Sequence, residues 1–177
     1  MSISYRQLDR AELLSRLGEI DRSEHVTLAY RYEQGSLITR QVDWPVKRWT
    51  ADQIAEHIQM LDPELEEGGQ ALSAFEGELM VGICVLGNRP LGKDGDMLQL
   101  VFLHVSREYR RRGIASHFMR DAAARASARG AQALYISATE SESAVGYYLQ
   151  QGARLAEQVD DRLYALEPED IHLVLPI

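Results

Sequence analysis

Three consecutive arginines stand directly before a glycine, between a strand-like apolar run and a helical pattern. The segment reads Arg110-Arg111-Arg112-Gly113-Ile114-Ala115-Ser116. The N-terminus of a helix presents unpaired backbone N–H groups and a partial positive charge, so it attracts anions. Glycine lets the main chain approach a ligand closely, and guanidinium groups attract phosphate. The segment therefore predicts a cradle for a pyrophosphate.

Two common phosphate-binding loops do not fit this segment. The chain lacks the G-x-x-x-x-G-K-[ST] pattern of a Walker A loop, and Gly113 does not open the G-x-G-x-x-G pattern of a dinucleotide site. The residues Arg110–Ala115 instead fit [QR]-x-x-G-x-[GA], which resembles the acetyl-CoA signature of the GNAT N-acetyltransferase superfamily. The preceding Val105–Tyr109 resembles the V-x-P-x-[YF] approach of that family, with Ser106 or Arg107 where proline is common.

A second segment strengthens the resemblance. The stretch Ala138–Ala153 is similar to the family pattern N-x-x-A-x-x-F-Y-x-x-x-G-F, and Ala144, Tyr148 and Gly152 match it by position. Ser141 departs from it, because asparagine is common there. The resemblance spans about Gln70 to Ile177 and includes the opening strand and helix more loosely.

The resemblance implies a cofactor site with particular residues. Acetyl-CoA would enter a V-shaped gap between strands 97–105 and 133–137, and backbone groups near Leu103 and Val105 would pair with its pantetheine arm. The amides of residues 111–116 would bind the pyrophosphate, and Ser141 would lie beside the cofactor arm. An amine would then attack the thioester directly. The resemblance implies no metal.

Direct attack needs a base for the amine and an acid for the departing thiolate. Tyr148 stands where the family carries its thiolate-protonating tyrosine, whereas Tyr147 is expected to pack. Many relatives place a glutamate on the strand that corresponds to 97–105, but Gln99 stands at this position here. An amide is not a useful base at neutral pH, so Gln99 is expected to orient the acceptor or a water.

The identity of the base stays open. Glu140, just past strand 133–137, could reach the acceptor side, and Glu24 and His25 lie where the family builds its acceptor pocket. His104 titrates in a suitable range, but simple alternation places its side chain opposite to that of Gln99, so it is expected to be structural.

The first part of the chain is expected to build the acceptor side. Residues 2–8 and 11–20 have strand and helix patterns, and 26–32 with 36–42 predict a hairpin around Glu33-Gln34-Gly35. Thr50 with Gln53 predicts a capped helix that Pro63 and Gly68-Gly69 end.

The later part alternates strands and helices. Strands are expected at 70–75, 79–86, 97–105, 133–137, 153–159 and 171–175, helices at 113–129 and 142–151, and a loop at 87–95. These elements predict one α/β domain over 1–177, with acceptor-side elements in 1–69 and the cofactor half in 70–177. The resemblance implies a mixed, mostly antiparallel sheet of six to seven strands, about four helices and a splayed central pair.

The composition limits the partners. A net charge of −8 argues against nucleic-acid binding, although seven arginines gather between Arg107 and Arg129. The chain has no apolar run long enough to span a membrane and no signal-peptide pattern at its start, so a cytoplasmic protein is expected. The lone Cys84 lies in an apolar run and is expected to be buried.

Three functions remain in order of preference. The first is an N-acetyltransferase for a small amine, an amino acid or a peptide N-terminus, with its acceptor pocket built from residues 21–49, 50–67 and 87–95. The second is a non-catalytic CoA-binding or regulatory module, which the absence of glutamate at 99 favours. The third, a nucleotide or nucleic-acid binder, is disfavoured by charge. A homodimer is possible, with 171–177 as one candidate edge.

Overall fold

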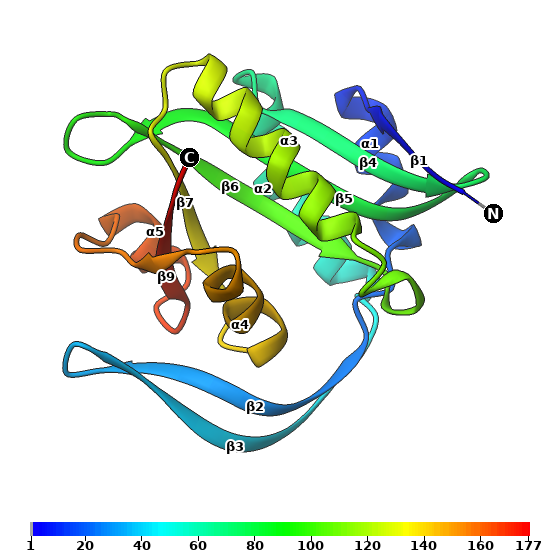
Figure 1. The fold of residues 1–177 in the computed structure, drawn as a ribbon. Coiled ribbons are helices and arrows are strands. Elements are labelled where there is room, and N and C mark those ends of the chain that lie inside the picture. Colours follow the sequence, from blue (N-terminus) through cyan, green and yellow to red (C-terminus); the bar gives the residue numbers. More distant parts are fainter. Residues whose placement is uncertain (1) are drawn as a thin grey trace.

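Seven strands form one sheet in the order β1-β4-β5-β6-β7-β9-β8 in the computed structural model, which describes residues 2–177 (Figure 1). All neighbours are antiparallel except β6 and β7, which run parallel. The predicted mixed, mostly antiparallel sheet is confirmed. The strands are β1 (Ile3–Gln7), β4 (Gln70–Glu76), β5 (Leu79–Leu91), β6 (Met97–Val105), β7 (Ala133–Ala138), β8 (Arg154–Leu155) and β9 (Ile171–Pro176).

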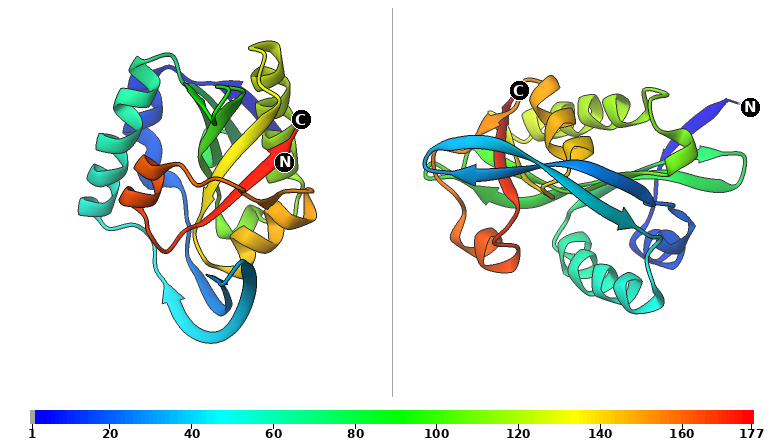
Figure 2. Two further views of the ribbon diagram at one scale, coloured as in Figure 1. Left: turned by 90° about the vertical axis from the view of Figure 1, so that its left-hand side faces the viewer. Right: turned by 90° about the horizontal axis from the view of Figure 1, so that it is seen from below.

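Helices cover both faces of the sheet. Helices α3 and α4 lie on one face, and α1, α2 and α5 lie on the other (Figure 2). Each face has its own apolar core, because alternate residues of the central strands point to opposite sides. The helices are α1 (Arg10–Arg16), α2 (Ala51–Glu66), α3 (Ile114–Ala128), α4 (Glu142–Gln150) and α5 (Asp161–Leu166).

Helix α2 begins as expected and ends later than Pro63. The Thr50 hydroxyl accepts from the Gln53 N–H, and the Gln53 side chain accepts from the Thr50 N–H, so the capping box is confirmed. Pro63 lies inside the last turn, and the helix continues to Glu66 before Gly68 takes a positive φ of 99°.

The predicted hairpin is present, but it forms a sheet of its own. Strands β2 (Glu24–Glu33) and β3 (Ser36–Val46) pair only with each other in the sheet arrangement of residues 2–177. Gln34 and Gly35 both have positive φ, as a tight hairpin turn requires. The hairpin crosses below α4 (Figure 1), and the Tyr30 N–H donates to the Glu140 carbonyl at 2.7 Å.

Two expectations for the later part were wrong, and one helix was missed. Residues 87–91 are not loop, because β5 continues to Leu91 and pairs with the start of β6. The strand expected at 153–159 has only two residues. The helix α5 was missed; the Asp160 side chain caps it by accepting from the Leu163 N–H. Strand β9 is not a bare edge, since β8 pairs with it at Leu173 and Val174.

The parallel strands β6 and β7 pair only at their beginnings. Their register runs from Met97–Ala133 to Gln99–Tyr135, so the remainder of each strand is unpaired with the other. Helix α3 lies beside the gap on one face (Figure 1). The splayed central pair that the family resemblance implied is therefore present.

A bulge in β6 overturns the expected orientation of His104. Leu86 pairs with Leu100 and Val85 with Phe102, so one residue of β6, Val101, has no partner on β5. Leu98 and Leu100 pack in the core under α3, whereas Phe102 packs in the core under α2. The extra residue resets the alternation, so Gln99 and His104 leave the sheet on the same face.

None of the helices in residues 2–177 is long and apolar enough to cross a membrane.

Candidate cofactor and acceptor site

The turn before α3 presents an uncapped helix N-terminus. Gly113 is its N-cap residue, has a φ of 82°, and provides no side-chain hydrogen bond. The α-helices α1, α2, α4 and α5 each have a side chain that caps the first turn, so α3 differs from the other α-helices of residues 2–177. A Cβ added at Gly113 would meet no atom within 4 Å, which leaves open space in front of the amides. This geometry fits an anion such as a diphosphate.

Arg110 does not direct its side chain towards that space. Its Nε donates to the Val105 carbonyl at 3.1 Å, Nη1 to Glu24 Oε2 at 2.7 Å, and Nη2 to the Arg22 carbonyl at 3.0 Å. Glu24 in turn accepts from the Ser143 hydroxyl at 3.1 Å. Arg110 therefore connects the turn to β2 and, through Glu24, to α4.

The two following arginines remain exposed. Arg111 has a positive φ of 59°, and the Arg112 guanidinium stacks over the Tyr109 ring at 4.9 Å. The Tyr109 hydroxyl donates to Glu76 at 2.7 Å, so this ring anchors the turn to β4. Arg111 and Arg112 are thus the exposed guanidinium groups of this turn, and their attraction for phosphate stays a prediction.

The main chain of β6 offers unpaired groups to the gap. The Ser106 N–H donates to the Val81 carbonyl of β5, which indicates that the main-chain groups of His104 also face β5. Those of Leu103 and Val105 therefore face the gap. The Val105 carbonyl already accepts a hydrogen bond from Arg110. The N–H and carbonyl of Leu103 and the N–H of Val105 therefore remain to bind a ligand. Their role in binding stays a prediction.

Tyr148 of α4 lies on the same face of the sheet as α3. It is 8% exposed and packs in the same core as Cys84 of β5, which pairs with Leu103. Burial, and then the neighbouring Cys84 and Tyr147, raise the pKa of Tyr148 far above its usual value. The phenol is therefore protonated at neutral pH, as a proton donor must be.

The two sequence candidates after β7 have structural partners. The Ser141 hydroxyl caps α4 by accepting from the Ala144 N–H at 3.3 Å, and this side chain is buried. The Glu140 carboxylate pairs with Arg40 of β3 at 3.2 Å. The hairpin thus contacts the segment after β7 at Glu140. The roles predicted for Glu140 and Ser141 stay predictions.

On the opposite face, His104 lies in an aromatic cluster with Trp49, His57 and Phe102. Its ring centroid is 4.9 Å from that of Trp49 and 4.5 Å from that of Phe102. Burial first, and then the positive charges of His57, Arg22 and Arg110, lower the pKa of His104 to about 3. A base with this pKa is weak at neutral pH, which agrees with a structural role.

His25 lies outside this arrangement. It is exposed on β2, and its Nε2 contacts Asp43 Oδ1 of β3 at 2.5 Å.

Sequence analysis missed a carboxyl on the same face. The Ser137 hydroxyl of β7 donates to Asp170 Oδ2 at 2.9 Å, directly before β9. Asp170 lies within the acid-rich stretch Glu157–Asp170, so nothing in its type or spacing separated it from surface carboxylates. The only feature of the sequence that could have singled out Asp170 is its position directly before an apolar strand.

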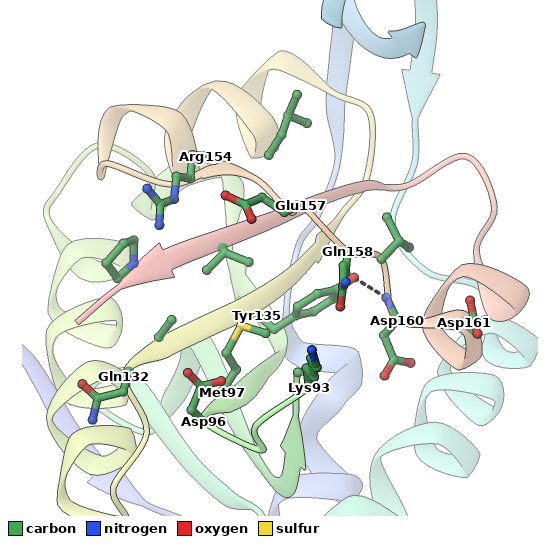
Figure 3. Close-up of a pocket in the computed structure, with 16 residues that line it drawn as sticks. Lys93, Asp96, Met97, Gln132, Tyr135, Arg154, Glu157, Gln158, Asp160 and Asp161 are labelled. Atoms are coloured by element: carbon green, nitrogen blue, oxygen red, sulfur yellow. Dashed lines mark hydrogen bonds between the residues drawn. The ribbon is translucent and has the colours of Figure 1, made fainter. Parts of the chain in front are cut away.

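A cavity of about 560 Å³ lies at the paired end of β6 and β7. Tyr135 and Met97 form part of its wall, and the Tyr135 hydroxyl accepts from the Asp160 N–H at 2.9 Å (Figure 3). Its charged lining contains more carboxylates than cations, namely Asp96, Glu157, Asp160 and Asp161 with Lys93 and Arg154. Of the segments predicted to build the acceptor pocket, 21–49, 50–67 and 87–95, only the last contributes to this wall, with Gly92 and Lys93.

Within residues 2–177 no group of three or more His, Cys, Asp or Glu side chains is placed to bind a metal ion.

Comparisons with known proteins agree with this architecture. The profile of the Acetyltransferase (GNAT) family matches residues 36–153. Among solved structures, a nourseothricin acetyltransferase superposes with a TM-score of 0.72 and 20% identity over 99% of both chains. A Bacillus anthracis str. Ames protein described as a streptothricin acetyltransferase, solved with acetyl coenzyme A, gives 0.70 and 15% over 100% of this chain and 99% of its own.

A protein acetyltransferase has the same fold. The ribosomal-protein-S18-alanine N-acetyltransferase of Escherichia coli gives a TM-score of 0.59 and 13% identity over 99% of this chain and 94% of its own. No curated protein sequence gave a significant match. The family profile covers about two thirds of the chain, and the residues that carry its cofactor signature lie on the splayed strand and the uncapped helix. The chain therefore belongs to the GNAT acetyltransferase family.

Proposed function

We propose that the protein transfers an acetyl group from acetyl-CoA to a primary amine of a small molecule. The observation that carries the proposal is the uncapped N-terminus of α3 beside the gap between β6 and β7. The amides of residues 111–116 would bind the pyrophosphate, and Leu103 and Val105 would pair with the pantetheine arm. This binding mode would put the thioester in the gap, within reach of both faces of the sheet.

The two faces would serve different partners of the reaction. Tyr148 stands on the α3 face, where its protonated phenol can supply a proton to the departing sulfur. The acceptor would approach from the other face, between α2 and α5. Gln99, Asp170 and the carboxylates that line the cavity beside Tyr135 lie on this face. The cavity beside Tyr135 lies on this face and offers space for a larger acceptor than an amino acid. Its excess of carboxylates favours an acceptor with positive charge.

A non-catalytic CoA-binding module is the second candidate. The observation in its favour is Gln99, which replaces the glutamate that many relatives carry on this strand. The splay, the uncapped helix and Tyr148 would all persist in such a module, so these features do not distinguish the two candidates.

A two-part experiment separates these candidates. Calorimetry with CoA and acetyl-CoA tests the cofactor site, and thiol release is then measured with a panel of amines, followed by mass spectrometry of the product. The panel contains nourseothricin, an aminoglycoside, a polyamine and a peptide with an N-terminal alanine. An acetylated product supports the enzyme. Tight CoA binding without any product supports the module, and no CoA binding contradicts both.

A further inference from the structure

Asp170 is a half-buried carboxyl group on the acceptor face of the sheet. Leu134, Ile136 and Ala138 of β7 pack in the core under α3, so Ser137 points to the opposite face. Ser137 pairs across the strands with His172 of β9, which places these two side chains side by side. The hydrogen bond from Ser137 Oγ to Asp170 Oδ2 fixes the carboxylate beside them.

This carboxylate lies level with the open part of the gap. The last paired residue of β7 is Tyr135, and Ser137 follows two residues later, so it lies about 7 Å further along the strand. At that level β7 has β9 on one side and the gap on the other. A thioester in the gap would have Tyr148 on the α3 face and Asp170 on the α5 face.

The charges around Asp170 suit a proton acceptor for a cation. Within residues 2–177 it forms no ion pair with a basic side chain, and the charged groups that act on it are Glu167 and Glu140. Burial first, and then the negative charge of Glu167, raise the pKa of Asp170 to about 7, whereas the Ser137 hydroxyl lowers it. A base is most effective when its pKa is near the working pH.

A polar atom on the same face of the sheet, His172 Nε2, has no partner within residues 2–177. His172 is 6% exposed, and its Nδ1 contacts the Tyr135 hydroxyl at 2.8 Å. That hydroxyl also accepts from the Asp160 N–H, and the tautomer with the ring proton on Nε2 lets it donate its own proton to Nδ1. Within residues 2–177 this buried Nε2 finds no acceptor. A polar ligand group that accepts from Nε2 would satisfy this atom.

We propose that Asp170 is the catalytic base that takes a proton from the ammonium group of the acceptor, and that Ser137 is its positioning residue. This inference rests on the function proposed above. It assigns the role that Gln99 cannot perform and for which Glu24, His25 and Glu140 were the sequence candidates. Glu167 contributes negative charge that attracts the ammonium group, whereas the charge of Glu140 is paired with Arg40.

The step balances as follows. The Asp170 carboxylate takes one proton from R–NH₃⁺ and leaves a neutral amine, whose lone pair forms the N–C bond with the thioester carbonyl. The C–S bond breaks, and Tyr148 protonates the sulfur. The surplus proton on nitrogen returns to the Tyr148 phenolate through water, and Asp170 releases its proton to solvent. Ammonium and thioester thus become amide, thiol and one proton.

The test uses the full-length enzyme with an acceptor from the amine panel. For the wild type, kcat/KM for the ammonium acceptor should fall as the pH drops below about 7, because Asp170 becomes protonated. Asp170→Asn should lower kcat/KM at pH 7.5 by about 100-fold or more and abolish this limb. Glu169→Gln changes an exposed carboxylate one residue away and should preserve both the rate and the profile.

Two further measurements exclude a merely structural effect. An O-alkyl hydroxylamine is already neutral at this pH, so Asp170→Asn should impair its acetylation far less than that of the ammonium acceptor. Ser137→Ala retains the carboxylate but removes a hydroxyl that lowers its pKa, so the acidic limb should move to higher pH. This second variant decides the matter if thermal melting shows that Asp170→Asn does not fold.

The outcomes separate the two proposals. An unchanged pH profile in Asp170→Asn, equal losses with both acceptors, or an unmoved limb in Ser137→Ala overturns the role of Asp170 while the acetyltransferase stands. A wild-type enzyme that binds CoA but acetylates no amine overturns the proposed function itself.

Discussion

Arg110 Nη1 donates a hydrogen bond to Glu24 Oε2 at 2.7 Å, which joins the turn before α3 to the first residue of β2. Glu24 also accepts from Ser143 in the first turn of α4. The two residues are far apart in sequence, so the hairpin between α1 and α2 helps to set the shape of the cofactor turn. In this chain the first arginine of the signature supports the turn rather than facing a phosphate with its side chain.

This relationship predicts how the loss of the Arg110 side chain affects cofactor binding. Arg110→Gln removes a charge-assisted hydrogen bond to Glu24 and bonds to two carbonyls, so the turn should loosen. We expect the Kd for CoA in calorimetry to rise about tenfold, as the loss of roughly 1.4 kcal/mol implies. Arg120→Gln makes the same charge change at an exposed position of α3 and should have little effect. Equal losses in the two variants would mean that only net charge matters.

Gly113 should affect both folding and binding, unlike a second glycine in the same conformation. Gly113→Ala forces a side chain into a φ of 82°, which costs about 1–2 kcal/mol of unfolding free energy, and places a methyl group before the amides. Gly130→Ala introduces the same strain at a φ of 87° at the other end of α3. Neither Cβ meets an atom within 4 Å.

Chemical denaturation should therefore show similar destabilisation in both glycine variants. Calorimetry should show weaker CoA binding only in Gly113→Ala. If Gly130→Ala weakened CoA binding equally, the effect would come from the helix as a whole and not from a ligand at its N-terminus.

The pattern of apolar residues along the sequence predicted the strands and helices whose buried residues recur at regular spacing. Strand β6 was predicted at its observed bounds, because its residues are apolar on both faces. The cap of α2 was also predicted, since Thr50 and Gln53 are neighbours in sequence. By contrast, α5 depends on Asp160 and on Leu163 packing against Leu91, and neither stands out in an acid-rich segment.

The candidate site was predictable only where a motif lies within one segment. The turn before α3 and the position of Tyr148 follow from local spacing. The bulge at Val101 depends on pairing with β5, so alternation alone gave the wrong face for His104. The pair Ser137–Asp170 joins a residue of β7 to the residue directly before β9, and no sequence spacing brings them together.

Tyr148→Phe tests the proton donor. The substitution removes the phenol proton and retains the packed ring, so kcat should fall while the KM for acetyl-CoA changes little. We expect a reduction of about 100-fold, within the range of general acid catalysis. Tyr147→Phe is the matched control, because its ring lies 5.4 Å from that of Tyr148 on the same helix. Turnover unchanged in Tyr148→Phe, or reduced equally in both, would remove Tyr148 from the mechanism.

His104 should make the fold sensitive to acid. Its pKa is lowered to about 3 in the folded protein, mainly by burial, whereas an unfolded histidine titrates near 6.5. Between these values the unfolded chain binds a proton that the folded chain does not. The unfolding free energy should therefore fall as the pH drops below about 6.5, by up to about 1.4 kcal/mol per pH unit. Burial also lowers the pKa of His57, so this residue adds to the same trend.

Urea denaturation at pH 7 and at pH 4.5 measures this loss. His104→Leu retains an apolar contact with Trp49 and Phe102 but has no ring to protonate, so its unfolding free energy should fall less over the same interval. A wild-type slope in His104→Leu would show that groups other than His104 cause the acid sensitivity. A histidine that stays neutral in the folded protein must destabilise the folded state at every pH where the same histidine is protonated in the unfolded chain.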